Sequence, residues 1–284
     1  MDTPVAFFIF NRPDLTRLTF QRIAEARPQR LFIVADGPRP NRPDDVANCE
    51  AARAAVADIG WPCEVMRNYS PRNLGCGQRV ASGLDWVFAR TDRAIVVEDD
   101  CLPAPEFFTF CHEMLERYAD APEVAAVAGT NFLTGRYEVA ESYVFSRYCH
   151  LWGWATWRRA WAGYDFGMAG LGDMLLSGRF EARMPDDEVA RRWFANFTSV
   201  LSGQVDTWDF QFFYMMLQND MLSVVPQANL VTNLGCGRMD ATHTVADSAL
   251  GGLPAKPMRH PLIHPDTLTP FALHDHLEDR LMCG

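Results

Sequence analysis

The chain has 284 residues, 48% hydrophobic and 22% charged, which is the composition of an ordinary globular protein with a sizeable core. Its formal net charge of -10 argues against nucleic acid as a partner, because phosphate binding needs a basic face. No cysteine pair has CxxC spacing and no apolar run is long enough for a signal peptide or a transmembrane segment. We therefore expect a reduced, cytoplasmic protein, with peripheral association at the inner face of a membrane left open.

Strands and helices are predicted to alternate over the first 130 residues. Apolar runs predict strands at 5–10, 30–36, 63–69, 94–98 and 124–130. Helical spacing predicts helices at 14–27, 43–58, 73–90 and 106–118, the third opened by a glycine-rich turn. This alternation is typical of βαβ units and predicts an α/β fold, Rossmann-like, with a mostly parallel central sheet covered by helices on both faces.

The regular alternation of predicted strands and helices stops after residue 130. Residues 146–161 contain four tryptophans, and 186–201 has a helix-like pattern of acidic and basic residues. Residues 223–235 are strand-like but contain Pro226, which predicts edge strands. From about 246 the chain is rich in Gly, Pro and His and has an irregular pattern. We expect a single domain made of two halves, 1–130 and 131–245, followed by a C-terminal tail at 246–284.

Polar residues and glycines collect where the predicted strands end. Right-handed crossovers bring the carboxyl ends of parallel strands to one edge of the sheet, where ligands bind in folds of this class. The residues at these ends are Asn11, Arg12, Asp36, Asn73, Gly75, Glu98, Asp99 and Asp100.

Three adjacent acids, Glu98, Asp99 and Asp100, end the fourth strand. Adjacent carboxylates repel one another, and buried ionised groups are costly unless they are paired or bound to metal. A solvated strand end that caps the next helix is the plain alternative. At the ligand edge of a parallel sheet we favour a site for Mg²⁺ or Mn²⁺, which commonly bridge one or two carboxylates to a diphosphate. No GxxxxGK[ST] loop is present, which disfavours a P-loop nucleotide hydrolase.

With this triplet and the preceding strand ends, the chain resembles nucleotide-sugar glycosyltransferases of the GT-A fold, of the family 2 type, over roughly residues 4–245. The EDD triplet also resembles that of the Golgi N-acetylglucosaminyltransferases that act on mannose. The resemblance implies an inverting, metal-dependent transfer of a sugar from a nucleoside diphosphate-sugar to a hydroxyl of a glycan or glycolipid. Synthesis of a bacterial surface polysaccharide is one such setting. The first half would bind the nucleotide sugar and the second half the acceptor.

The resemblance also implies individual roles for residues of the first half. Asp100 would be the metal ligand, while Glu98 and Asp99 would contact the donor. The remaining donor-binding positions would be Phe10, Asn11, Arg12, Asp36, Asn73, Gly75 and Arg79. The base stays open, because the first strand ends in FNRPD, which departs from the pattern common in the family.

In the second half, Asp206 and Asp209 stand three residues apart at a predicted helix start. By themselves they are best explained as a capping arrangement. The resemblance instead implies that Asp209, which follows Trp208, is the catalytic base, with Asp206 as the alternative. An inverting transfer needs one carboxylate beside the acceptor hydroxyl to remove its proton.

Two further segments have both a structural and a functional interpretation. The tryptophan-rich segment is either core or a loop that borders a sugar site. The resemblance favours Gly153 and Trp154 as acceptor contacts and leaves Trp152 or Trp157 to the core. In the glycine-rich stretch 233–244, the resemblance implies that His243 completes the metal or diphosphate shell. Arg238 could contact the diphosphate by its charge.

Two other functions stay open. Sugar-nucleotide pyrophosphorylases share the fold but normally carry a glycine-rich loop and a lysine after the first strand. This chain has FNRPD there, and its single lysine is the distant Lys256. The other alternative is a non-catalytic glycan-binding or interaction module. The intact acid triplet and the Trp208-Asp209 pair argue against it.

Overall fold

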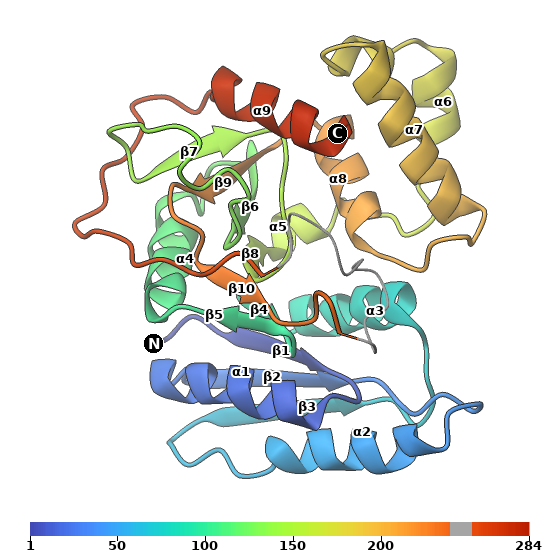
Figure 1. Ribbon diagram of the computed structural model, residues 1–284, viewed down its shortest axis with the longest axis vertical. Helices are drawn as coiled ribbons and strands as arrows, with labels where there is room; N and C mark the ends of the chain where they lie inside the picture. The colour runs from blue at the N-terminus through green and yellow to red at the C-terminus, as the bar shows by residue number, and fades with distance from the viewer. Residues whose placement is uncertain (239–251, 284) are drawn as a thin grey trace.

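The computed structural model describes residues 1–238 and 252–283 (Figure 1). Its centre is an eight-stranded sheet in the order β3-β2-β1-β4-β8-β6-β9-β7. The strands are β1 Val5–Ile9, β2 Arg30–Ala35, β3 Glu64–Tyr69, β4 Arg93–Glu98, β6 Val124–Ala128, β7 Tyr143–Ser146, β8 Trp154–Trp157 and β9 Leu222–Pro226. A separate antiparallel pair is formed by β5 (Cys101–Pro103) and β10 (Val231–Asn233).

Strands β1 to β4 are parallel to one another, and β6 is also parallel to β9. Strand β8 runs antiparallel between β4 and β6, and β7 is antiparallel to β9 at the edge. The helices are α1 Pro13–Ala26, α2 Asp44–Ala55, α3 Cys76–Phe88, α4 Pro105–Arg117, α5 Arg158–Trp161, α6 Leu171–Leu176, α7 Asp187–Leu201, α8 Asp209–Gln218 and α9 Ala272–Cys283. The predicted α/β class, with its mostly parallel sheet in one domain, is confirmed.

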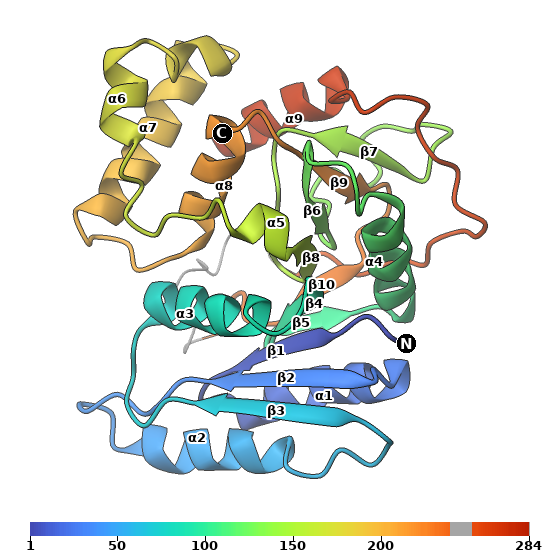
Figure 2. The same ribbon diagram turned by 180° about the vertical axis from the view of Figure 1, so that it is seen from behind.

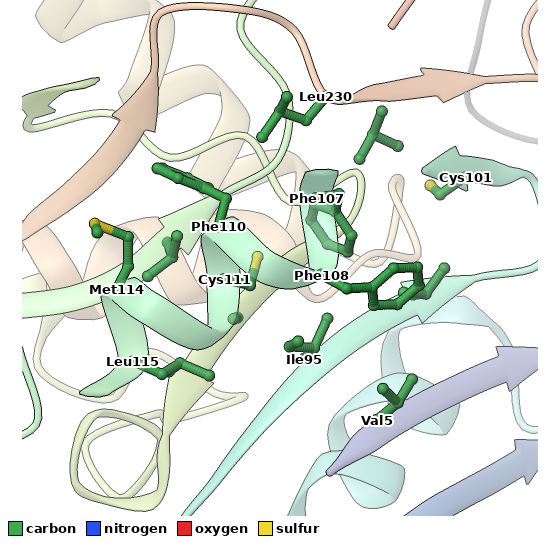
Figure 3. Close-up of a cluster of buried hydrophobic side chains, with 14 of the residues drawn as sticks. Val5, Ile95, Cys101, Phe107, Phe108, Phe110, Cys111, Met114, Leu115 and Leu230 are labelled. Atoms are coloured by element: carbon green, nitrogen blue, oxygen red, sulfur yellow. The ribbon is translucent and has the colours of Figure 1, made fainter. Parts of the chain in front are cut away.

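Alternation along the strands explains why both faces of the sheet are covered. In β1, Val5 and Phe7 face one side and Ala6 and Phe8 the other, because successive side chains of a strand point to opposite faces. The Val5 side packs against α1 and α4, where Phe107 and Phe110 lie over the sheet (Figure 3). The Ala6 side packs against α3, α5 and α8. All of these β1 residues are buried, as expected for a strand covered by helices on both faces, whereas the edge strand β3 is only half-buried and exposes Glu64 and Arg67.

A helical lobe adds a third layer beyond α8. Helices α6 and α7 and a short 3₁₀ turn at Glu181–Arg183 lie side by side at one end of the molecule (Figures 1 and 2). Helix α8 is apolar on two faces: Phe212 and Met216 pack against the sheet, while Phe213 and Tyr214 pack against the lobe. Helix α8 thereby joins the lobe to the sheet.

The structure refines three predictions about the chain after residue 130. The tryptophan-rich segment is only partly a loop: residues 147–153 form no helix or strand, whereas Trp154–Trp157 form the interior strand β8. Strand β9 is not an edge strand, since it lies between β6 and β7, and Pro226 is tolerated as its last residue. The tail is not irregular throughout, because it ends in α9, which packs against β7 and α7. Among residues 1–238 and 252–283, no helix has the length and apolar character needed to cross a membrane.

Replacing Phe110 by alanine tests the packing of α4 on the sheet. Phe110 is completely buried, so Phe110→Ala is expected to lower the free energy of unfolding by about 3–5 kcal/mol through lost burial and the cavity left behind. The matched control is Phe166→Ala, at a phenylalanine with 45% of its surface exposed, which is expected to cost less than about 1 kcal/mol. Urea unfolding followed by circular dichroism measures both. Equal losses would contradict the assignment of Phe110 to the core.

Candidate functional site

A cavity of about 620 Å³ lies at the carboxyl ends of β1, β2 and β4. This is the edge at which the sequence predicts a ligand site. Its walls include eleven residues singled out in the sequence: Phe10, Arg12, Asp36, Asn73, Gly75, Arg79, Glu98, Asp99, Asp100, Asp206 and Asp209. The fold therefore brings together side chains from both halves of the chain, separated by up to about two hundred positions.

The acid triplet lies on the cavity wall in a strongly negative environment. Burial raises the pKa of Asp99 to about 7, with a further contribution from the neighbouring charge of Asp100. Burial also raises the pKa of Glu98 well above its usual value, and the charges of Asp100, Asp99 and Asp209 add to this effect. Burial and the neighbouring carboxylates therefore both disfavour ionisation of Glu98 and Asp99, and compensation has to come from hydrogen-bond donors or cations.

The residues after β1 provide part of that compensation. Phe8 of β1 is paired with Glu98 of β4, so the segments that follow the two strands run side by side. The backbone N–H of Phe10 donates a hydrogen bond to Asp99 at 3.0 Å. The guanidinium of Arg12 contacts the carboxylate of Asp100 at 2.8 Å.

Asp36 organises the turn that follows β3. Its carboxylate accepts hydrogen bonds from the Asn73 side chain (2.8 Å), the Leu74 backbone N–H (3.0 Å) and the Gly37 N–H (2.8 Å). Burial raises the pKa of Asp36, although these hydrogen bonds oppose the shift. Asp36 and Asn73 therefore shape one wall of the cavity by bonding to each other. The Arg79 guanidinium, also buried, donates to the Asn68 carbonyl at 2.7 Å.

Asp206 joins the second half to the first. It does not cap α8, as the sequence suggests, because its carboxylate accepts hydrogen bonds from the backbone N–H groups of Cys76 (2.8 Å) and Gly77 (3.0 Å). Those groups belong to the N-terminus of α3, where a negative charge is favourable. Gly75, with φ +82°, is needed here because a Cβ atom would lie 2.3 Å from the Asp206 carboxylate.

Asp209 is the first residue of α8 and faces the cavity. One carboxylate oxygen accepts two hydrogen bonds. The first comes from the Phe210 N–H at 2.9 Å, in the first turn of the helix, and the second from the Thr207 hydroxyl. The other oxygen accepts no hydrogen bond from residues 1–238 or 252–283. Asp209 is also close enough to Glu98 for its charge to raise the pKa of that group.

Several predicted site residues lie elsewhere. Asn11 does not line the cavity but donates to Asp45 at 2.7 Å. Trp154 is buried in the core, where it stacks on Trp208 at 5.4 Å, and Gly153 packs against Val231. Neither position faces the cavity, so the structure does not place them as acceptor contacts.

The structure places Arg238 beside Asp14, at 2.9 Å. His243 lies outside the described residues. Asp100 is nevertheless close to the start of this glycine-rich stretch. A Cβ atom on Gly235 would lie 2.3 Å from the Asp100 carboxylate, so that chain segment passes directly against the acid triplet.

Other cavity residues were not predicted from the sequence. Arg39 lies over the ring of Phe10 at 5.2 Å and pairs with Asp45 at 2.6 Å. Its hydrogen bond lowers the pKa of Asp45 to about 2. Arg39 comes just after the end of the second predicted strand, and this position in the sequence could have marked it as a candidate site residue. Aromatic side chains that were not singled out also line the cavity, namely Phe132, Tyr148, His150, Trp193, Phe210 and Phe213. Trp152, expected in the core, lines the cavity as well.

The described residues contain no cluster of three or more His, Cys, Asp or Glu side chains arranged to hold a metal ion by themselves. The acid triplet offers carboxylate oxygens, the ligand type that Mg²⁺ and Mn²⁺ prefer. Within residues 1–238 and 252–283, the member of the triplet with a cationic side chain in direct contact is Asp100, which pairs with Arg12. Carboxylate oxygens of this kind suit a divalent cation that takes its other ligands from a bound phosphate group.

No protein-family model and no curated protein matches the chain. Solved structures with some similarity include LgtC galactosyltransferase in complex with donor and acceptor sugar analogues, at 10% identity and a TM-score of 0.39, with 76% of this chain and 70% of that chain covered. Mouse xyloside xylosyltransferase 1 has 11% identity and a TM-score of 0.36, with coverages of 78% and 82%. UDP-glucose pyrophosphorylase complexed with UDP-glucose has 12% identity and a TM-score of 0.27, with coverages of 46% and 64%. Similarity at these scores supports no conclusion about function.

Proposed function

We propose that this protein is an inverting, metal-dependent glycosyltransferase. It moves a sugar from a nucleoside diphosphate-sugar to a hydroxyl of a glycan or glycolipid acceptor, and synthesis of a bacterial surface polysaccharide is a suitable setting. The observation that supports this most is the meeting of the acid triplet with Asp209 on the walls of one cavity of about 620 Å³. A cavity of this size suits a small-molecule ligand.

The donor end of the site is assigned to the carboxyl ends of β1, β2 and β4. Asp100 is the ligand for Mn²⁺ or Mg²⁺, and Glu98 and Asp99 orient the donor sugar and ribose. When bound, the cation would stabilise the negative charge that develops on the leaving diphosphate. The place of all three carboxylates on the wall of one cavity supports this assignment. Arg12 holds the Asp100 carboxylate at 2.8 Å and so fixes its orientation.

Asp209 is assigned as the base that removes the proton from the acceptor hydroxyl. The hydrogen bonds from Phe210 and Thr207 hold one of its oxygens, which leaves the other to accept a proton. Asp206, the alternative base, is occupied by two backbone N–H groups of α3 and therefore suits a structural role better. This difference in partners favours Asp209.

The two other functions are less compatible with the site. After β1 the chain enters α1 at once through Asn11, Arg12 and Pro13, without the glycine-rich loop expected of a sugar-nucleotide pyrophosphorylase. A module that only binds glycan would not require a carboxylate held like that of Asp209, beside a triplet of acids. We therefore favour the transferase.

Two substitutions separate donor binding from transfer. Asp100→Ala is expected to lose metal-dependent donor binding, because it removes the ligand that joins cation and protein. Asp209→Asn keeps the shape of the side chain and should retain donor affinity, while kcat falls by a factor of about 10² or more, the usual contribution of a general base. Calorimetry with a panel of nucleoside diphosphates, with and without Mn²⁺, measures binding, and turnover of nucleotide sugars measures transfer.

The matched control for both is Asp44→Ala, at an exposed aspartate of α2 outside the cavity, which should change neither quantity. Failure of the wild-type protein to bind any nucleoside diphosphate in a metal-dependent way would overturn the proposed function. Full activity of Asp209→Asn would show that the base is another residue.

Gly235→Ala tests the position of the Asp100 carboxylate independently. The added methyl group would collide with that carboxylate, at 2.3 Å, so donor affinity is expected to fall by about tenfold or more. Gly172→Ala is the control, because a Cβ atom there meets nothing within 4 Å. Calorimetric titration with the donor nucleotide compares the two. Equal affinities would mean that Asp100 moves aside without loss of function and is not the metal ligand.

A further inference from the structure

The part of the cavity wall built after residue 130 is aromatic. The rings of Phe132 and Trp152 meet edge to face at 5.2 Å, and those of Trp193 and Phe213 stack at 3.9 Å. Both pairs line the cavity, whereas the charged residues come mainly from the strand ends of the first half. We call the part of the wall formed by Phe132, His150, Trp152, Trp193 and Phe213 the aromatic end of the cavity, and the part formed by the acids and Arg12 at the strand ends the charged end.

His150 lies within the aromatic end. Its ring meets the ring of Phe132 at 4.3 Å, and its side chain lines the cavity. His150 follows β7 in the chain and is contacted by α9, the helix of the C-terminal tail. The ring nitrogen Nε2 is 3.0 Å from a carboxylate oxygen of Glu278 on α9. Nδ1 of His150 makes no hydrogen bond with residues 1–238 or 252–283, so one ring nitrogen remains for a ligand.

Glu278 is completely buried. Burial alone would raise its pKa, but the charge and hydrogen bond of His150 reverse the effect, and the pKa lies below the usual value. The carboxylate therefore accepts a hydrogen bond from Nε2 of His150, and this contact holds the ring in one orientation. A buried carboxylate needs such a partner, because an unpaired charge in the interior is costly.

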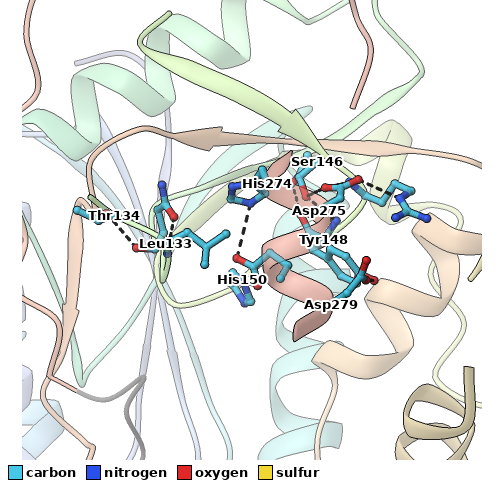
Figure 4. A network of polar contacts seen from close by, with 12 residues as sticks. Leu133, Thr134, Ser146, Tyr148, His150, His274, Asp275 and Asp279 are labelled. Atoms are coloured by element: carbon cyan, nitrogen blue, oxygen red, sulfur yellow. Dashed lines mark hydrogen bonds and ion pairs between the residues drawn. The ribbon is translucent and has the colours of Figure 1, made fainter. Parts of the chain in front are cut away.

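His274 provides a comparison within the same cluster (Figure 4). It is also completely buried, and burial lowers its pKa, with Glu278 and Asp275 opposing and His150 adding to the shift. Its Nδ1 is 2.7 Å from the Tyr137 hydroxyl, and its Nε2 is 3.6 Å from Glu278. Unlike His150, it does not line the cavity. Glu278 thus contacts one histidine of the cavity wall and one of the core.

We propose that the aromatic end of the cavity binds a pyranose ring of the acceptor and that His150, oriented by Glu278, hydrogen-bonds one of its hydroxyls. A pyranose has apolar C–H faces that pack on aromatic rings and a rim of hydroxyls that need hydrogen-bond partners. This end of the cavity offers both. Glu278 is a positioning residue, which acts through His150. The inference rests on the proposed function, since only a transferase needs a second sugar beside the donor.

Ligand-observed NMR titrations of the full chain test the proposal. The probes are the methyl pyranosides of glucose, galactose, mannose and N-acetylglucosamine, and a panel of nucleoside diphosphates with Mn²⁺. The wild-type protein is expected to bind at least one pyranoside. His150→Ala and Trp152→Ala should each raise the Kd of that pyranoside by about tenfold or more, without changing nucleoside diphosphate affinity. Glu278→Gln should raise it less, because the amide oxygen can still accept the hydrogen bond.

The matched control is His274→Asn, which removes the other partner of Glu278 without touching the cavity. It should lower the thermal unfolding temperature but leave the Kd of the pyranoside unchanged. Even if Glu278→Gln does not fold, His150→Ala decides the matter, because His150 is partly exposed, with 16% of its side-chain surface accessible.

Three outcomes would overturn the inference. The first is a wild-type protein that binds nucleoside diphosphates but no pyranoside, which leaves the proposed function intact. The second is an unchanged pyranoside Kd in His150→Ala. The third is a loss of nucleoside diphosphate affinity in His150→Ala equal to the loss for the sugar, which would make the aromatic end the nucleobase site. Failure of the proposed function itself would appear differently, as absence of nucleoside diphosphate binding in the wild-type protein.

Discussion

The parallel pairing of β1 with β4 is the constraint on which the charged end of the site depends. Because Phe8 is in register with Glu98, the residues that leave β1 pass directly beside the acids that leave β4. The Phe10 N–H then reaches Asp99, and the Arg12 guanidinium reaches Asp100. Three adjacent carboxylates would repel one another at an unsupported strand end. Here two contacts from the neighbouring segment hold Asp99 and Asp100 in place at the cavity wall.

The second half of the chain completes the cavity by docking on the first. Asp206 binds the N-terminus of α3 through two backbone N–H groups, and Gly75 leaves room for it. This contact fixes the segment that leads into α8, and Asp209 is the first residue of that helix. Asp206, which resembles a helix cap in the sequence, therefore connects two distant segments of the chain by hydrogen bonds. This connection positions Asp209, the candidate base.

Much of the charged end could be predicted from the sequence, because strand ends are local features and parallel strands bring them to one edge. The aromatic end could not. Tryptophans 152 and 154 are two residues apart, yet one lines the cavity and the other lies in the core. Trp154 begins an interior strand, and Trp152 precedes it. The two residues are identical in type and lie in the same apolar segment, so composition alone does not show which one lines the cavity and which one is buried. Likewise, α9 has polar residues facing inward, where Ser146 and Tyr148 bond to Asp275 and Asp279 (Figure 4).

The sequence by itself determined the α/β class, the alternation of the first half and the gathering of acids and amides at strand ends, because all of these follow from short-range patterns of apolar and polar residues. Only the tertiary structure decided that Asp206 binds the N-terminus of α3 while Asp209 keeps one carboxylate oxygen without a hydrogen bond from the described residues, and that His150 is held by Glu278 from the tail. These partners are more than one hundred residues apart. Their pairing depends on how the helices pack on the sheet, and no local pattern of the chain encodes it.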